Sequence, residues 1–580
     1  MRRIAFFVLF RGSAFVFTNM ISKFRPCLII LSLLFLVQIA LAQFPKPDMN
    51  RARTYDVQNY IIRVGFDRPD KKVIGDTTVQ FKPLKPGFTQ AEFDAVGMKF
   101  DSVTLDPSGA ALKYRTTSDK VTVTLDKAYS PDDLVSVRFK YTTTAPRKGV
   151  YFVDASRENA VDQPYQIWTQ GEAEEARYWF PSFDFPSDKA TSEEFITAEK
   201  GQTVIANGEE LEQKDNGDNT VTHHFKMSIP YSTYLTSFVI GTYVKQTDMH
   251  GSIPLGFYVY PGKESIVQPA FGRTKDMMQA YEEVTGIPFP YNKYDQTIVR
   301  NFKFGGMENI TATTHSDQDV FLVNFEFGKP AVQDLVSHEL SHSWFGDMVT
   351  CKNWSELYLN EGFADFMESV AREKLYGRDS YNRKIRSDAE QFMVDDEINK
   401  RRHGLFNRLA DPSSDSLFDT TTYQKGGTVI HTLRQYIGDD AFWKGINAYL
   451  NAHKFGNVET ADLRRAMEQA SGKDLGWFFE QWIYGAGYPK LSVAQNWTPG
   501  TNTLRLTVTQ TQPLDKITPA AFRLPMDLEI KTASGTVTKP IELKKRVEVL
   551  TFKLDGKPTA LNFDPQDNIP LKTVKILPAK

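Results

Sequence analysis

The chain has 580 residues, of which 41% are hydrophobic and 13% aromatic, and its formal net charge is −2. This length exceeds what one hydrophobic core usually serves, so we expect about three or four domains, and the apolar content excludes a largely disordered protein. A nucleic-acid-binding protein needs a basic surface that displaces phosphate counterions. The charge balance has no basic excess, so we expect no nucleic-acid partner.

The N-terminal segment has the pattern of an export signal. Basic residues precede an apolar run at 27–42, CLIILSLLFLVQIALA, which ends in the small-x-small sequence of a signal-peptidase site. The run is too short to span a bilayer comfortably. We therefore predict a signal peptide over residues 1–42, cut before Gln43 and starting at Met1 or Met20. The product is expected in the periplasm or the medium without a stable membrane anchor; the alternative is an uncleaved anchor.

The rest of the chain divides into three predicted domains, which together give a multidomain α+β fold. Residues 43–246 contain short runs of alternating apolar and polar side chains between turn residues, a pattern typical of an antiparallel β domain. Residues 247–488 place apolar residues at helical spacing, so we predict a mainly helical domain. Alternation returns over 489–580, where a small β-sandwich is the simplest interpretation. The clearest helices are expected over 268–285, 329–345 and 354–375.

One pattern in the helical domain is typical of a metal site. His338 and His342 stand four residues apart with Glu339 between them, so both imidazoles lie on one helix face and can reach one ion. A catalytic zinc takes three protein ligands and keeps an open position for water. Glu361, eighteen residues beyond the second histidine, is the candidate third ligand. Asp365, at i+4 from it, is a candidate acceptor for a ligand imidazole. The alternative is two ordinary helix histidines.

A glycine-rich segment precedes His338 by about thirty residues: Gly305-Gly306-Met307-Glu308-Asn309. The paired glycines permit an extended edge that a peptide backbone can approach closely. A carboxylate there can pair with the free α-ammonium of a peptide and fix its first peptide bond at the metal. The segment therefore favours an exopeptidase, with Met307 as a candidate lining residue of the side-chain pocket. The alternative is a turn with a surface glutamate.

In this order the elements resemble the M1 family of zinc aminopeptidases, whose signature is GxMEN followed by HExxH, eighteen residues and Glu. Upstream, TQGE at 169–172 and the stretch at 176–184 are similar to the family's TQxE and ARxxFPCFDEP segments. Ser182 replaces the usual Cys, and Phe185 replaces the usual Glu. Downstream, YQKGG at 423–427 is similar to the family's YxKGA segment.

The resemblance implies a thermolysin-like catalytic domain between an N-terminal β domain and a β-sandwich. It also implies that Glu172 binds the substrate's amino terminus together with Glu308, and that Tyr423 stabilises the transition state. From the residues alone, Tyr423 would be interpreted as a buried structural phenol. The large helical C-terminal domain of many members is expected to be absent, because about 90 residues follow Pro489.

The predicted activity is removal of the N-terminal residue from peptides that have a free N-terminus. One Zn²⁺ per chain, held by His338, His342 and Glu361, would lower the pKa of its bound water toward about 7. Glu339 would take the water proton as general base. The rival hypotheses are a thermolysin-type endopeptidase, a non-catalytic peptide-binding module on the same scaffold, and an epoxide hydrolase side activity, which occurs in one branch of the family.

Overall fold

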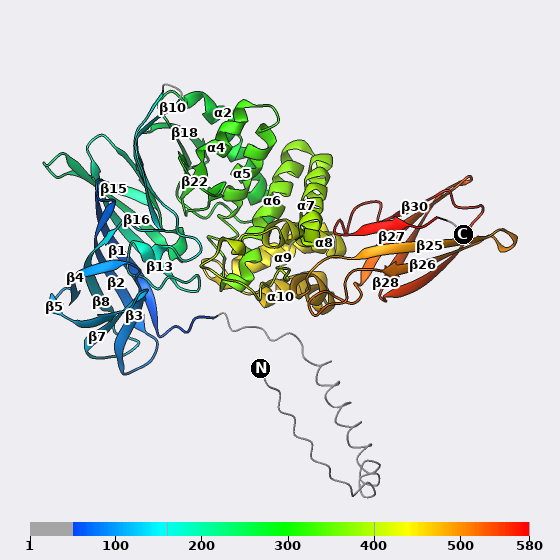
Figure 1. Ribbon diagram of the computed structural model, residues 1–580, viewed down its shortest axis with the longest axis horizontal. Coiled ribbons are helices and arrows are strands. Elements are labelled where there is room, and N and C mark those ends of the chain that lie inside the picture. Colours follow the sequence, from blue (N-terminus) through cyan, green and yellow to red (C-terminus); the bar gives the residue numbers. More distant parts are fainter. Residues whose placement is uncertain (1–49, 159–160, 399–400, 579–580) are drawn as a thin grey trace, which may run out of the picture. The chain divides into compact units, whose positions relative to one another are not determined.

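The computed structural model describes residues 50–158, 161–398 and 401–578. The predicted signal peptide and its cleavage site lie outside these residues. Along the described chain, strands come first, helices dominate the middle and strands return at the end (Figure 1). This order confirms the predicted multidomain α+β fold class. None of the described helices combines the length and the apolar character that crossing a membrane requires.

The N-terminal region is built from strands that alternate buried and less buried residues, as the period-2 pattern predicts. Its largest sheet contains, in spatial order, β15 (Glu209–Asp215), β16 (Thr220–Ser232), β13 (Lys189–Glu199), β1 (Tyr55–Asp67), β2 (Lys72–Pro83), β8 (Val135–Thr144), β4 (Met98–Leu105) and β5 (Ala110–Ala111). Two smaller sheets contain β14 (Thr203–Ala206), β17 (Phe238–Gly241), β12 (Gln166–Thr169) and β9 (Val150–Val153), and β3 (Phe88–Asp94), β7 (Lys120–Tyr129) and β6 (Lys113–Thr116).

A five-stranded sheet at the start of the middle region was not anticipated from the sequence. Its spatial order is β18 (Val244–His250), β19 (Ile253–Val259), β20 (Tyr294–Val299), β22 (Ala312–Ser316) and β21 (Gly306–Met307). β20 and β22 pair in parallel, and every residue of both strands is buried. Strands buried on both faces lose the period-2 alternation, so their pattern gave no strand signal. The short β21 pairs antiparallel with β22 and forms the sheet edge.

The helices that carry the candidate site differ at their ends from the sequence prediction. α5 (Lys329–Ser341) has Pro330 in its first turn, where no intrahelical N–H bond is lost. It ends before residue 345 because the chain turns back at Gly346, whose φ is 132°. The predicted helix at 354–375 is a 3₁₀ helix at Trp354–Leu359 followed by α6 (Glu361–Tyr376). The other long helices are α3 (Thr274–Thr285), α7 (Arg378–Ile398), α8 (Gly426–Ile437), α9 (Asp439–Ala452) and α10 (Thr460–Ser471).

The C-terminal region contains two sheets. One has the order β29 (Val547–Lys553), β26 (Thr503–Gln510), β25 (Lys490–Thr498) and β31 (Thr573–Ile576), and the other has the order β28 (Gly535–Leu543), β27 (Leu524–Thr532) and β30 (Ala560–Phe563). Alternate residues of β26 and β27 are buried, as expected for strands with one face toward a core.

One buried tyrosine ties α3 to both site helices. The hydroxyl of Tyr281 lies 3.0 Å from the carbonyl oxygen of Ser337 on α5 and 3.0 Å from that of Met367 on α6. Tyr281→Phe should therefore lower the free energy of unfolding by roughly 0.5–1.5 kcal/mol. The measurement is the urea midpoint. Tyr376→Phe, at a side chain that is 48% exposed, is the matched control, and equal midpoints for the two variants would contradict the role of Tyr281.

Candidate active site

A cavity of about 750 Å³ opens between β21, α5, α6 and the π-helical turn at Thr421–Lys425. Among the predicted site residues, all except Asn309 and Asp365 line it. Asn309 is buried beyond the end of β21. Its side-chain amide donates a hydrogen bond to the Thr314 hydroxyl on β22 at 3.0 Å, so it contacts the sheet and does not line the cavity. The structure thus brings together residues that are up to about 250 positions apart in the sequence.

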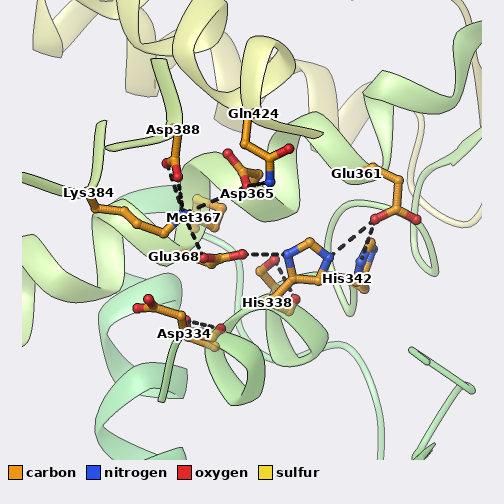
Figure 2. Close-up of polar contacts among 12 residues, drawn as sticks. Asp334, His338, His342, Glu361, Asp365, Met367, Glu368, Lys384, Asp388 and Gln424 are labelled. Carbon is orange, nitrogen blue, oxygen red and sulfur yellow. Dashed lines mark hydrogen bonds and ion pairs between the residues drawn. The ribbon is translucent and has the colours of Figure 1, made fainter. Parts of the chain in front are cut away.

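Two imidazoles converge on one carboxylate (Figure 2). Nε2 of His338 lies 3.2 Å from Oε2 of Glu361, and Nε2 of His342 lies 3.4 Å from the same oxygen. All three side chains are buried. Burial raises the pKa of Glu361, but the charge of His342 and hydrogen bonds from both imidazoles lower it to about 2, so the carboxylate is ionised. Two nitrogens and one carboxylate oxygen within 4.8 Å of one another are a donor set that suits zinc.

The second nitrogen of each imidazole has a different acceptor. Nδ1 of His342 lies 2.9 Å from the carbonyl oxygen of Phe345, and Nδ1 of His338 lies 2.8 Å from Oε1 of Glu368. The predicted hydrogen bond from an imidazole to Asp365 is therefore wrong, because Oδ1 of Asp365 instead faces Nε2 of Gln424 at 3.5 Å. Glu368 follows Glu361 by seven residues and so lies on the same face of α6. This i+7 spacing from Glu361 is the sequence signal by which Glu368 could have been found.

The segment at 305–308, which includes β21, runs alongside α5, and its successive residues face successive positions along that helix. A Cβ added to Gly306 would lie 2.1 Å from Oε1 of Glu339, and one added to Gly305 would lie 3.2 Å from the Leu335 side chain. At the other end of the edge, Oε1 of Glu308 lies 3.9 Å from Nδ1 of His342. Only glycine fits at position 306 without displacing the glutamate. The cavity therefore has a direction: Glu308 marks one end, Glu339 the middle and Leu335 the other end.

Two buried carboxylates meet at the Glu308 end. Glu172 enters from the segment after β12, where Gly171 packs so closely that an added Cβ would lie 2.0 Å from the Tyr234 carbonyl oxygen. Oε1 of Glu172 and Oε1 of Glu308 are buried without a hydrogen-bond partner among the described residues. Burial, followed by the charge of Glu308, raises the pKa of Glu172 well above its usual value. A buried carboxylate oxygen without a hydrogen bond is unfavourable, so this end of the cavity is suited to a cation.

The remaining predicted side chain is a phenol. The ring of Tyr423 stacks against that of His338, with centroids 5.9 Å apart and planes at 13°. Burial, followed by the charge of Glu361, raises the pKa of Tyr423 well above its usual value, so the hydroxyl keeps its proton and can donate. Among the described residues that line the cavity there is no lysine or arginine, and the acidic lining also favours a positively charged ligand.

Comparison with protein families gives two matches along the chain. The family model described as peptidase M1 N-terminal domain matches residues 55–235, and the one described as peptidase family M1 domain matches residues 270–482. The chain belongs to peptidase family M1. This confirms the resemblance inferred from the motifs. Glu172 lies in the first matched region, and all other residues of the candidate site lie in the second.

Individual M1 relatives are similar over much of this chain. Aminopeptidase N from Streptomyces lividans is 31% identical over 71% of the chain and 48% of the relative. Tricorn protease-interacting factor F2 from Thermoplasma acidophilum is 29% identical over 85% of the chain and 60% of the relative. Aminopeptidase 2 from Candida albicans is 30% identical over 65% of the chain and 41% of the relative. The chain thus spans about half the length of the curated relatives it matches.

Proposed function

We propose that this chain is a zinc-dependent aminopeptidase that hydrolyses the N-terminal residue from peptides. One observation carries the proposal: two buried carboxylates, Glu172 and Glu308, lie within 4.8 Å of Glu361, the acceptor of both imidazoles, and Oε1 of each has no hydrogen-bond partner among the described residues. A site for a cation thus adjoins a donor set for a metal. Membership of family M1 and the names of the relatives support the same activity.

His338, His342 and Glu361 would hold the ion. The fit rests on their chemistry, because two imidazole nitrogens and one carboxylate oxygen are the ligands of several catalytic zinc sites. When bound, zinc supplies Lewis-acid polarisation of the scissile carbonyl and a water that is acidic enough to be deprotonated at neutral pH.

The direction of the cavity supports an exopeptidase. Glu172 and Glu308 would bind the α-ammonium of the substrate by charge-assisted hydrogen bonds. The edge of β21 would pair with the peptide backbone, which places the first peptide bond beside Glu339. The rest of the peptide would then run toward Leu335. An internal segment of a protein has no free α-ammonium to place between the two carboxylates, so the endopeptidase alternative is disfavoured.

Two side chains would act on the reacting atoms. Glu339 accepts a proton from the attacking water and delivers it to the leaving amine, and its Oε2 is buried without a hydrogen-bond partner among the described residues. Tyr423 donates its phenolic hydrogen to the oxyanion that develops on the carbonyl. Both would be superfluous in a non-catalytic peptide-binding module, so that alternative is also disfavoured.

We further propose domain boundaries and a destination from the sequence pattern. The signal peptide covers residues 1–42, the β domain 43–246, the catalytic domain 247–488 and the C-terminal β domain 489–580. Removal of the signal peptide on export would leave the enzyme in the periplasm or the medium.

The direct test uses a panel of fluorogenic aminoacyl substrates, each with a free or an N-acetylated amine, with and without a chelator. We expect cleavage of the free-amine substrates only, loss of cleavage on chelation, and recovery with Zn²⁺. Equal rates on acetylated peptides would favour the endopeptidase, and binding without any turnover would favour the peptide-binding module.

Glu308→Gln tests the amino-terminus site separately. The substitution keeps the shape of the side chain but removes one charge that faces the ammonium. Loss of one partner from a buried charge pair typically costs about 2–5 kcal/mol, so kcat/KM for free-amine substrates should fall by about 30-fold or more. The exposed Glu326, whose side chain is 89% accessible, supplies the matched control as Glu326→Gln. An unchanged kcat/KM in the Glu308 variant would refute its role in binding the amine.

A further inference from the structure

On the Nδ1 side of His338, opposite Glu361, lies a cluster of buried charged side chains (Figure 2). Oε1 of Glu368 faces Nδ1 of the histidine at 2.8 Å, and Oε2 of the same carboxylate faces Nζ of Lys384 at 2.9 Å. The carboxylate therefore bridges an imidazole on α5 and an ammonium on α7. Both of its oxygens are held, which leaves it no freedom to rotate without losing a hydrogen bond.

The ammonium is itself anchored. Nζ of Lys384 donates to Oδ1 and Oδ2 of Asp388, both at 2.8 Å, and lies 3.7 Å from Oδ1 of Asp365. The lysine side chain is only 11% exposed, and lysine is rarely buried unless it is paired. Burial lowers the pKa of Lys384, but the charges of Asp365, Glu368 and Asp388 raise it well above its usual value. The cluster thus contains a permanent positive charge at a fixed position.

The tautomer and the ring orientation of His338 depend on how firmly Glu368 is held. An imidazole that binds a metal through Nε2 must carry its proton on Nδ1, and an acceptor at Nδ1 fixes both that tautomer and the ring orientation. Only a carboxylate held in place gives the ring one orientation. We propose that Lys384 is a positioning residue that orients His338 toward the metal by holding Glu368, an inference that rests on the proposed role of His338 as a zinc ligand.

The competing explanation is a purely structural one, in which the cluster only joins α6 to α7. Buried ion pairs are weak evidence for stability, since the desolvation of the charges offsets much of their attraction. The two explanations predict different effects on the proposed metal site. A structural cluster affects unfolding alone, whereas a positioning residue affects metal affinity and ligand geometry in the folded protein.

The experiment compares three variants of the full chain: Lys384→Met, Lys384→Arg and, as control, Lys374→Met on α6. Lys374 is 40% exposed and pairs only loosely with Glu283, at 3.4 Å. Zinc affinity is measured by competition with a chromophoric chelator, and the visible spectrum is recorded after substitution with Co²⁺. Loss of a residue that supports a ligand typically weakens metal binding 10–100-fold. We expect that loss and an altered cobalt spectrum for Lys384→Met, recovery of both for Lys384→Arg, and no change for the control.

The outcomes separate this inference from the proposed function. A wild-type protein without stoichiometric zinc would refute the proposed function. Normal zinc binding by the wild type, together with unchanged affinity and spectrum for Lys384→Met, would overturn the positioning role alone. If Lys384→Met does not fold, Asp388→Asn decides: it loosens the ammonium but keeps its charge, so a weaker affinity supports the role and an unchanged one overturns it.

Discussion

Replacement of Glu339 by glutamine is expected to lower kcat by about 10²–10⁴-fold while the zinc content stays at one per chain. Glutamine fills the same space beside Gly306 but cannot accept the water proton. The proposed metal donors His338, His342 and Glu361 keep their side chains in this variant. KM should change little, since the residue acts in the transition state and not in substrate binding.

Steady-state kinetics and elemental analysis of the same preparation test this expectation. Glu326→Gln again serves as the control for a glutamate far from the reacting atoms and should keep the wild-type kcat. Wild-type turnover by Glu339→Gln would exclude it as the base. Loss of zinc from this variant would mean instead that the glutamate belongs to the metal site.

The fold class could be predicted from the sequence because most elements have one exposed face. β1, β8 and β13 alternate buried and less buried residues, so each leaves its period in the sequence. β20 and β22 could not be predicted in the same way, since both faces of these two strands are covered and all eleven of their residues are buried. Burial on two faces erases the pattern on which the prediction depends.

Some residues of the candidate site could likewise be predicted from the sequence, and others could not. The two histidines and Glu361 follow from a spacing that is fixed by helix geometry, and Glu308 follows from its glycine-rich edge. Glu368 was missed because Asp365 stands at an equally suitable helical position, and only the packing of α6 against α5, which carries His338, decides between them. Lys384 carries no local signal at all: its role depends on the fold that brings α7 to the back of the histidine.

Glu361→Ala is expected to abolish both zinc binding and turnover. The carboxylate oxygen is the point on which both imidazoles converge, at 3.2 and 3.4 Å. Its removal leaves two ligands where a catalytic zinc takes three, so the ion should be lost during dialysis. It also removes the negative charge that lies between His338 and His342, so two imidazoles in a buried site would face each other without a shared acceptor.

Elemental analysis and the urea midpoint, measured with and without added Zn²⁺, distinguish loss of the metal from loss of the fold. A ligand that binds only the native state stabilises it in proportion to the logarithm of its concentration over Kd. Added zinc should therefore raise the midpoint of the wild type and of Glu326→Ala, but not that of Glu361→Ala. Full zinc occupancy in the Glu361 variant would contradict the ligand assignment, and with it the idea that one carboxylate on α6 completes the metal site begun by α5.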